Sequence, residues 1–181
     1  MLKYLKNLYL NIRFNLWVRK KYVNRLEQLL KSAQHILFVC KGNICRSAFA
    51  EEYAKSILNN SFEISSCGYW TDDGKMSDQT AQKVAQSFGV DLSMHRTRMI
   101  SEELMNKSDI IFTFDYESIT SLCRKYPFIR HKLFLLGLLT KNNLIIRDPF
   151  GKDESDFREV FKMIREGVDN LASRVNRIRD K

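Results

Sequence analysis

Cys40 and Arg46 are separated by five residues, and the segments on either side of them suit a phosphate-binding site. The apolar run over 35–40 predicts a buried parallel strand, and helical spacing over 47–58 predicts a helix after it. Free amides at a helix N-terminus and in a curled loop bind anions such as phosphate. Arg46 can grip two phosphate oxygens with its planar guanidinium, and the same amides favour the nucleophilic thiolate of Cys40. The segment therefore predicts phosphoryl transfer through a cysteine.

The predicted phosphate-binding loop consists of the residues inside this pair and the serine after it. These are Lys41, Gly42, Asn43, Ile44, Cys45 and Ser47. Gly42 allows close approach of the backbone, and Ser47 can donate a hydrogen bond to the sulfur when it leaves. Cys45 has two open interpretations: a reversible disulfide with Cys40 that protects the thiolate, or a small buried residue that faces the helix. A cysteine and an arginine at this spacing arise by chance roughly 0.3 times in such a chain, so the surrounding strand and helix carry the prediction.

Strands and helices alternate through the rest of the chain. Short apolar runs predict three further strands, over 62–65, 109–114 and 132–136. Helical spacing predicts three further helices, over 77–88, 118–125 and 153–179. Residues 67–77 are expected to form a polar loop, and residues 104–106 a short turn. This alternation predicts an α/β fold: a three-layer sandwich with a central four-stranded parallel sheet and the phosphate-binding loop after its first strand.

The net charge of +9 is concentrated at the N-terminus. Residues 1–34 carry eight Lys or Arg against one Glu, a net charge of +7, whereas the remaining 147 residues carry 22 basic and 20 acidic side chains. Apolar residues recur at helical spacing over 2–31, with basic residues on the other faces. We therefore expect two parts: a basic amphipathic helical extension over 1–34 and a catalytic domain over 35–181.

Two interpretations of the extension stay open. Its apolar stripe packs on the catalytic domain or on a second copy of the chain, or else it lies on an anionic membrane with Tyr9, Trp17 and Tyr22 at the interface. No recognised nucleic-acid-binding module accompanies the basic residues, so no specific nucleic-acid partner is expected.

The chain also shows no secretory signal, no apolar run of membrane-spanning length and too few cysteines for a disulfide scaffold. We therefore expect a cytoplasmic location, with association to a membrane surface left open. The four cysteines are candidates for chemistry because a reducing compartment keeps thiols free.

The loop and several later segments resemble the low molecular weight protein tyrosine phosphatases. The family signature V-C-x-G-N-I-C-R-S-P-x-A-E is similar to Val39–Glu51, with Ala48 where the family usually has proline. Further matches follow in the family's order: Ser65–Gly68 with Gly74 and Asp78, Phe88–Arg98, Asp109–Asp115, and Ile146–Gly151 with Asp156 and Phe157. Other tyrosine phosphatases have a histidine before the nucleophile and an acid loop upstream of it. Here Val39 precedes the cysteine and Asp148 lies 108 residues downstream, which favours the small enzymes.

This resemblance implies hydrolysis of phosphotyrosine in proteins, with no metal and no cofactor. Cys40 would attack phosphorus to form a phosphocysteine, Arg46 would hold the phosphate, and Asp148 would protonate the departing phenolate and later deprotonate water. The family positions that hold the loop by hydrogen bonds correspond to Asn43, Ser47, Ser66 and His95. Asp115 is expected near the pocket in a supporting role, and Trp70 and Phe150 are candidate aromatic walls for the tyrosine ring.

Two departures from the family pattern bear on the substrate. Lys41 adds positive charge where the family often has an apolar or small residue, and Gly151 stands where some members have a second tyrosine. Bacterial members often act on tyrosine autokinases of polysaccharide export, so the resemblance offers such a kinase as partner.

Two alternatives to a phosphatase remain. The first is an arsenate reductase on the same fold, which needs a relay of two further cysteines; here Cys67 and Cys123 are not a closely spaced late pair. The second is a non-catalytic phosphotyrosine-binding or redox-sensing module. Intact residues at the three catalytic positions argue against that module.

Overall fold

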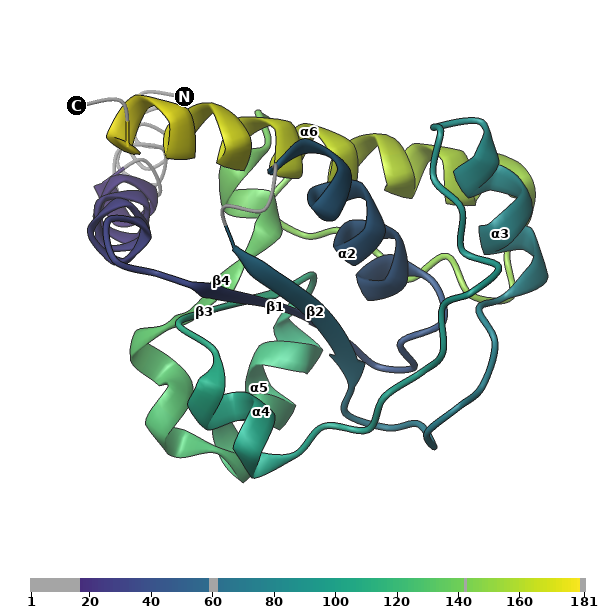
Figure 1. Cartoon of the computed structure of the whole chain (residues 1–181), viewed down its shortest axis with the longest axis horizontal. Coiled ribbons are helices and arrows are strands. Elements are labelled where there is room, and N and C mark those ends of the chain that lie inside the picture. The colour runs from purple at the N-terminus through teal and green to yellow at the C-terminus, as the bar shows by residue number, and fades with distance from the viewer. Residues whose placement is uncertain (1–16, 59–61, 142, 180–181) are drawn as a thin grey trace, which may run out of the picture.

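Four strands form one fully parallel sheet at the centre of the molecule (Figure 1). The computed structural model describes residues 17–58, 62–141 and 143–179. In the order β2-β1-β3-β4 across the sheet, the strands are β2 (Glu63–Gly68), β1 (His35–Cys40), β3 (Ile110–Thr113) and β4 (Leu133–Leu135). The predicted four-stranded parallel sheet is confirmed.

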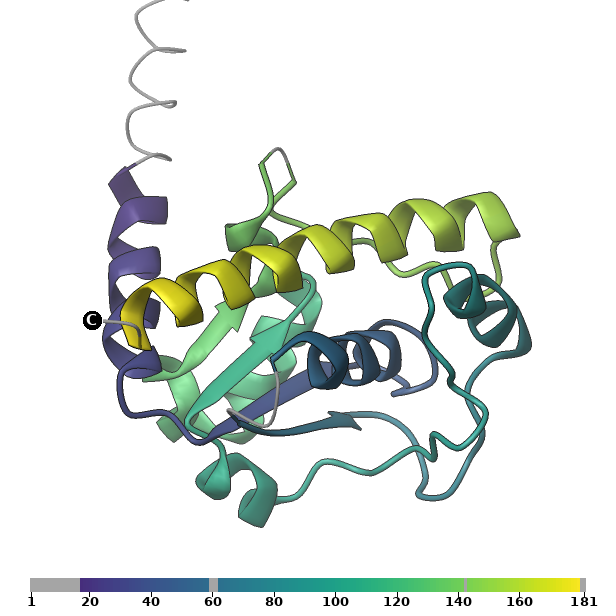
Figure 2. The same cartoon turned by 45° about the horizontal axis from the view of Figure 1, so that its top comes forward.

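Helices cover both faces of the sheet and complete a three-layer sandwich (Figures 1 and 2). One face carries α2 (Arg46–Ile57), α3 (Gln79–Gln86) and α6 (Glu154–Arg179). The other face carries α4 (Glu102–Lys107), α5 (Tyr116–Lys125) and the 3₁₀ helix η1 (Pro127–His131). A second 3₁₀ helix, η2 (Leu136–Leu139), follows β4 and packs on α6.

Strand β1 is buried on both of its faces. Ile36 and Phe38 point into the core beneath α2 and α6, whereas Leu37 and Val39 point into the core beneath α4 and α5. Successive side chains of a strand alternate between faces, so a strand covered on both sides must be apolar throughout. This burial fixes β1 in the middle of the sheet and places Cys40 at its carboxyl end.

Several short elements differ from their predictions. The strand predicted over 62–65 extends to Gly68, so Cys67 and Gly68, predicted as the start of a polar loop, instead pair with β1. The turn predicted over 104–106 is wrong, because these residues belong to helix α4, where the Ser101 hydroxyl caps the backbone N–H of Leu104 at 3.2 Å. The strand predicted over 132–136 is shorter, since the chain turns into η2 at Leu136. The helix predicted from residue 77 begins at Gln79, after an aspartate cap.

The N-terminal helix, described over residues 17–30, packs against the rest of the molecule. Leu26 and Leu30 are buried in the same core as Val175 of α6, and the carboxylate of Glu27 pairs with Arg174 and, at 2.6 Å, with Arg177 of α6. Figure 2 shows this helix crossing the C-terminal end of α6. Packing on the catalytic part is one of the two interpretations of the extension; residues 1–16, which the sequence also predicts as helical, lie outside the described residues.

Among the helices of the described residues, none has the length and apolar character needed to cross a membrane.

Candidate active site

The end of β2 packs directly against the predicted phosphate-binding loop. Gly68 lies beside Cys40 in the register of the two strands. A Cβ atom at Gly68 would lie 2.8 Å from the carbonyl oxygen of Lys41 and 3.1 Å from the amide nitrogen of Asn43. Only glycine allows this approach of β2 to the loop, so the close packing of the two backbones fixes the path of residues 41–45.

Asn43 adopts the left-handed conformation that lets the loop curl, with φ 54°. Its buried side chain donates to the hydroxyls of Ser66 at 2.7 Å and Ser47 at 2.9 Å, and its Oδ1 atom accepts from the backbone N–H of Arg98 at 2.9 Å. Asparagine tolerates this conformation better than most residues, and three side-chain hydrogen bonds hold it there. Among the loop residues, the left-handed conformation therefore lies at Asn43 and not at Gly42.

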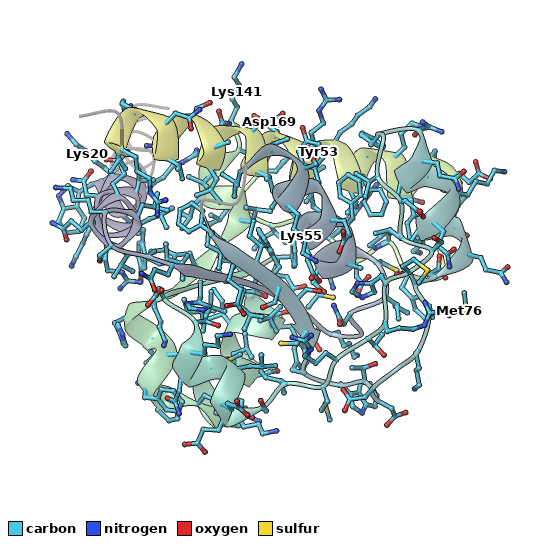
Figure 3. All side chains as sticks on the ribbon, viewed as in Figure 1. Lys20, Tyr53, Lys55, Met76, Lys141 and Asp169 are labelled. Carbon is cyan, nitrogen blue, oxygen red and sulfur yellow. The ribbon has the colours of Figure 1, made fainter. Side chains whose placement is uncertain are left out.

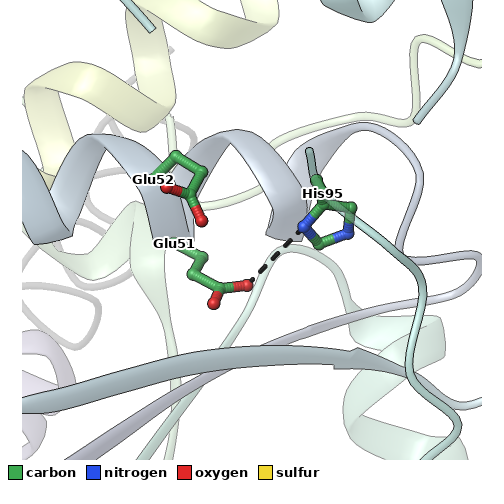
Figure 4. Close-up of side chains that lie close together, drawn as sticks. All are labelled: Glu51, Glu52 and His95. Carbon is green, nitrogen blue, oxygen red and sulfur yellow. Dashed lines mark ion pairs between the residues drawn. The ribbon is translucent and has the colours of Figure 1, made fainter. Parts of the chain in front are cut away.

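His95 lies close to Glu51 and Glu52 of helix α2 (Figure 4). His95 Nε2 is 2.9 Å from the carbonyl oxygen of Asn43, so this nitrogen carries the proton and donates. Glu51 accepts from the hydroxyl of Ser66 at 2.5 Å and lies 3.8 Å from His95 Nδ1. Ligand atoms of Glu51, Glu52 and His95 lie within 4.8 Å of one another. Because each group already has a hydrogen-bond partner, we interpret the cluster as a support for the loop.

The sulfur of Cys40 is surrounded by hydrogen-bond donors. Its Sγ atom accepts from the backbone N–H of Asn43 at 3.2 Å and lies 3.0 Å from the hydroxyl of Ser47. Both donors stabilise negative charge on sulfur, as a thiolate nucleophile and as a leaving group require. Cys40 and Cys45 are both free thiols, and their reversible disulfide stays a prediction.

Cys45 lies in the same loop but has different surroundings. Burial raises the pKa of the Cys45 thiol well above its ordinary value, and the negative charges of Asp78, Cys40 and Asp148 raise it further against the opposing effect of Arg46. A thiol with a raised pKa stays protonated at neutral pH and is a poor nucleophile. Of the two thiols in the loop, Cys45 is therefore the less suited to act as a nucleophile.

The guanidinium of Arg46 is buried and held by two carboxylates. Its Nη1 atom donates to Asp115 at 2.5 Å and to the carbonyl oxygen of Ile146 at 3.1 Å, and its Nη2 atom donates to Asp148 at 2.6 Å. Burial opposes the charged form, but the negative charges of Cys40 and the two aspartates outweigh it and raise the pKa of Arg46 above its ordinary value. The buried Nε atom makes no hydrogen bond to any described residue, so it remains free to donate to a substrate oxygen.

Asp115 performs two tasks with one carboxylate. It accepts from the backbone N–H of Ser118 at 2.8 Å as the N-cap of α5, and it pairs with Arg46. Burial would raise the pKa of Asp115, yet the hydrogen bonds from Ser118 and the interaction with Arg46 outweigh it and lower the pKa below its ordinary value. Asp115, which lies between β3 and α5, therefore fixes the orientation of the Arg46 side chain.

Cys40, Arg46 and Asp148 line one pocket of about 460 Å³ at the carboxyl end of the sheet. The aromatic side chains of Trp70 and Phe150 also line this pocket, and both are exposed; their role as walls for a tyrosine ring stays a prediction. The full lining comprises Cys40, Lys41, Gly42, Ile44, Cys45, Arg46, Trp70, Thr71, Lys75, Asp148 and Phe150. The sequence reasoning missed two of these, the threonine and the second lysine, because both lie in a polar loop without a recognisable pattern.

The family model for low molecular weight phosphotyrosine protein phosphatases matches residues 35–181. The protein-tyrosine-phosphatase Wzb of Salmonella typhi is 33% identical over 141 residues, which are 78% of this chain and 93% of the relative.

Two solved structures are similar to most of this chain. The crystal structure of the Erwinia amylovora tyrosine phosphatase AmsI has a TM-score of 0.74 at 30% identity, covering 78% of this chain and 92% of that one. The YwlE arginine phosphatase of Geobacillus stearothermophilus has a TM-score of 0.74 at 23% identity, covering 80% and 94%, and at this identity the likeness shows the fold alone. The geometry of the loop, the matched residues and these relatives together show that the chain belongs to the low molecular weight protein tyrosine phosphatase family.

Proposed function

We propose that this chain hydrolyses phosphotyrosine in proteins through a phosphocysteine intermediate. The observation that supports it is the convergence of the Cys40 thiol, the Arg46 guanidinium and the Asp148 carboxylate in one pocket. A nucleophile, a phosphate clamp and a general acid in one concave site are what metal-independent phosphoryl transfer requires.

The reaction proceeds in two displacements at phosphorus. The Cys40 thiolate attacks, the bond from phosphorus to the phenolic oxygen breaks, and protonated Asp148 gives its proton to that oxygen. A water molecule then attacks phosphorus, Asp148 takes a proton from the water, and the phosphorus–sulfur bond breaks to give inorganic phosphate. The donors from Ser47 and the amide of Asn43 stabilise the thiolate that is restored.

Phosphate binding requires an exchange of partners at Arg46. The free Nε atom and the Nη2 atom can bind two phosphate oxygens as a fork, and this displaces Asp148 from Nη2. Asp115 keeps Nη1 and so holds the guanidinium in place during the exchange. The released carboxylate is then free to face the leaving group.

Aromatic walls favour a phosphorylated tyrosine as substrate. Trp70 and Phe150 flank the pocket mouth and can stack on a phenyl ring. Relatives at 30% identity or more are named protein-tyrosine-phosphatases. A tyrosine autokinase as the protein substrate rests on family resemblance alone and stays a prediction.

Turnover of p-nitrophenyl phosphate at about pH 6 tests the mechanism. We expect that Cys40→Ser abolishes it and that Asp148→Asn slows it by about 10²- to 10⁴-fold, the usual contribution of a general acid. Full activity of Cys40→Ser would overturn the mechanism. Arsenate reduction without phosphatase activity would favour the reductase, and faster cleavage of phosphoarginine than of phosphotyrosine in peptides would overturn the substrate class.

We also propose that the N-terminal extension holds the enzyme on an anionic membrane surface. The described helix turns Leu26 and Leu30 inward, leaves Trp17 62% exposed, and projects Lys20 away from the body of the protein (Figure 3). Residues 1–34 have a net charge of +7, and their one acid, Glu27, is paired with arginines of α6. An exposed tryptophan beside lysines matches an interface between acyl chains and anionic headgroups.

Co-sedimentation of the full chain with vesicles tests this surface. We expect binding to vesicles that contain phosphatidylserine, weaker binding at high salt, and loss of binding in the Lys20→Glu/Lys21→Glu variant. The control variant Lys83→Glu/Lys125→Glu changes the net charge of the chain by the same amount, but at α3 and α5. It should bind as the wild type does. Equal binding of both variants, or no binding by the wild type, would remove the membrane proposal.

A further inference from the structure

We propose that Lys41 selects phosphotyrosines that have an aspartate or glutamate beside them in the peptide. This inference rests on the proposed phosphotyrosine phosphatase function and names the substrate class within it. Lys41 lies next to the nucleophile, where the family often has an apolar or small residue, and the hydrolysis mechanism gives its ammonium group no task.

The side chain of Lys41 is fixed at the rim of the pocket. Its carbonyl oxygen accepts the backbone N–H of Trp70 at 2.9 Å, and its Nζ atom lies 4.5 Å from the centroid of the Trp70 ring. Both residues line the catalytic pocket. A cation over the face of an indole is attracted to it, so the ammonium stays beside the ring on which a phosphotyrosine can stack.

Three cationic side chains line the pocket, and Lys41 makes the weakest ion pair of the three. Arg46 is bonded to two carboxylates, and Lys75 lies 2.6 Å from Asp72. The Nζ atom of Lys41 lies 4.0 Å from Glu117, the outer limit of an ion pair, and the side chains of Lys41 and Glu117 are 40% and 72% exposed. Exposed pairs of this kind contribute little, so an incoming carboxylate can replace Glu117.

A bound phosphotyrosine brings its peptide neighbours to this rim. With the ring against Trp70, a carboxylate one or two positions along the peptide can approach the Lys41 ammonium, whereas a lysine there meets a like charge. The contact is made equally in the ground state and in the transition state, because it lies outside the reacting atoms. It should therefore lower KM and leave kcat unchanged.

Matched phosphotyrosine peptides test the proposal. One has aspartates on both sides of the phosphotyrosine, and the other has alanines at those positions. For the wild type we expect kcat/KM to be about fivefold higher for the acidic peptide than for the alanine peptide. The difference should arise from a lower KM, and added salt should reduce it. Lys41→Met should lose this preference and Lys41→Arg should keep it. The matched control Lys83→Met, which removes one charge from α3 outside the pocket, should also keep it.

Three outcomes would overturn the proposal: no preference in the wild type, a preserved preference in Lys41→Met, or a fall in kcat that is equal for both peptides. The last result would mean that Lys41 only shapes the loop. Failure of the wild type to hydrolyse either peptide would instead overturn the phosphatase function itself, so the two failures are distinguishable.

Discussion

At the residue scale, the two thiols of the phosphate-binding loop differ in reactivity. Hydrogen-bond donors surround the sulfur of Cys40, whereas burial and nearby negative charge raise the pKa of Cys45. We expect iodoacetamide at neutral pH to alkylate Cys40 before Cys45, because the raised pKa of Cys45 keeps that thiol protonated and a protonated thiol reacts slowly. Mass spectrometry of the digested protein identifies which cysteine is alkylated. Earlier alkylation of Cys45 would contradict this assignment.

Asp115 makes the free energy of unfolding depend on pH in the acidic range. Its pKa is lowered in the folded state, so the unfolded chain binds more protons and the stabilisation is present above the unfolded value of about 3.9. That stabilisation is lost as the pH falls through the folded pKa. Asp115→Asn keeps a capping oxygen but removes the titration, so its unfolding free energy should fall less between about pH 5 and about pH 2.

Urea unfolding of the wild type and of Asp115→Asn at both pH values measures the difference. Glu117→Gln, a change to an exposed carboxylate in the same helical turn, is the matched control and should follow the wild type. An identical acid dependence in Asp115→Asn would show that this carboxylate gains no stabilisation from Arg46.

The sequence was sufficient to propose Cys40 and Arg46 as reacting residues, because a cysteine and an arginine at this spacing occupy one loop. It could not show that Asp115 and Asp148 both bind Arg46, since these contacts join residues 69 and 102 positions apart. Nor could it show that the left-handed residue is Asn43, a conformation fixed by hydrogen bonds with Ser66, His95 and Arg98. Such contacts depend on the folded chain.

At the element scale, the N-terminal helix stabilises the catalytic part through its apolar side. Leu30 is 0% exposed and lies in the core shared with α2 and α6. Leu30→Ala should lower the free energy of unfolding by about 2–5 kcal/mol, the usual cost of a cavity left by a buried leucine. Gln28→Ala, an exposed change on the same helix, should stay within about 0.5 kcal/mol of the wild type.

Chemical denaturation of both variants gives these values. A loss well below 1 kcal/mol for Leu30→Ala would show that the helix is not packed as described.

Long elements were easier to predict than short ones. Residues 153–179 repeat the helical pattern over many turns, and α6 spans Glu154–Arg179. The six residues of α4 and the four of η2 contain too few repeats for periodicity to identify them. Their ends are set by the Ser101 cap and by packing of η2 on α6, which is tertiary information.

At the scale of the whole molecule, charge and catalysis are separated. The basic excess lies in residues 1–34, whereas Cys40 and Arg46 line a pocket in the nearly neutral remainder of the chain, where we propose that phosphate binds. High salt should therefore weaken attachment to anionic vesicles more than it raises KM for p-nitrophenyl phosphate, because the pocket is partly buried and less screened. Parallel salt titrations of binding and turnover check this; equal sensitivity would contradict it.

The central claim is that Cys40 carries the phosphoryl group during turnover. Its most direct test is rapid acid quenching of the wild-type enzyme with p-nitrophenyl phosphate, followed by mass spectrometry of the peptide that contains Cys40. We predict one phosphoryl group on the sulfur of Cys40 in the wild type and none in Cys40→Ser. Turnover without a phosphorylated enzyme, or a phosphoryl group on another residue, would contradict the mechanism.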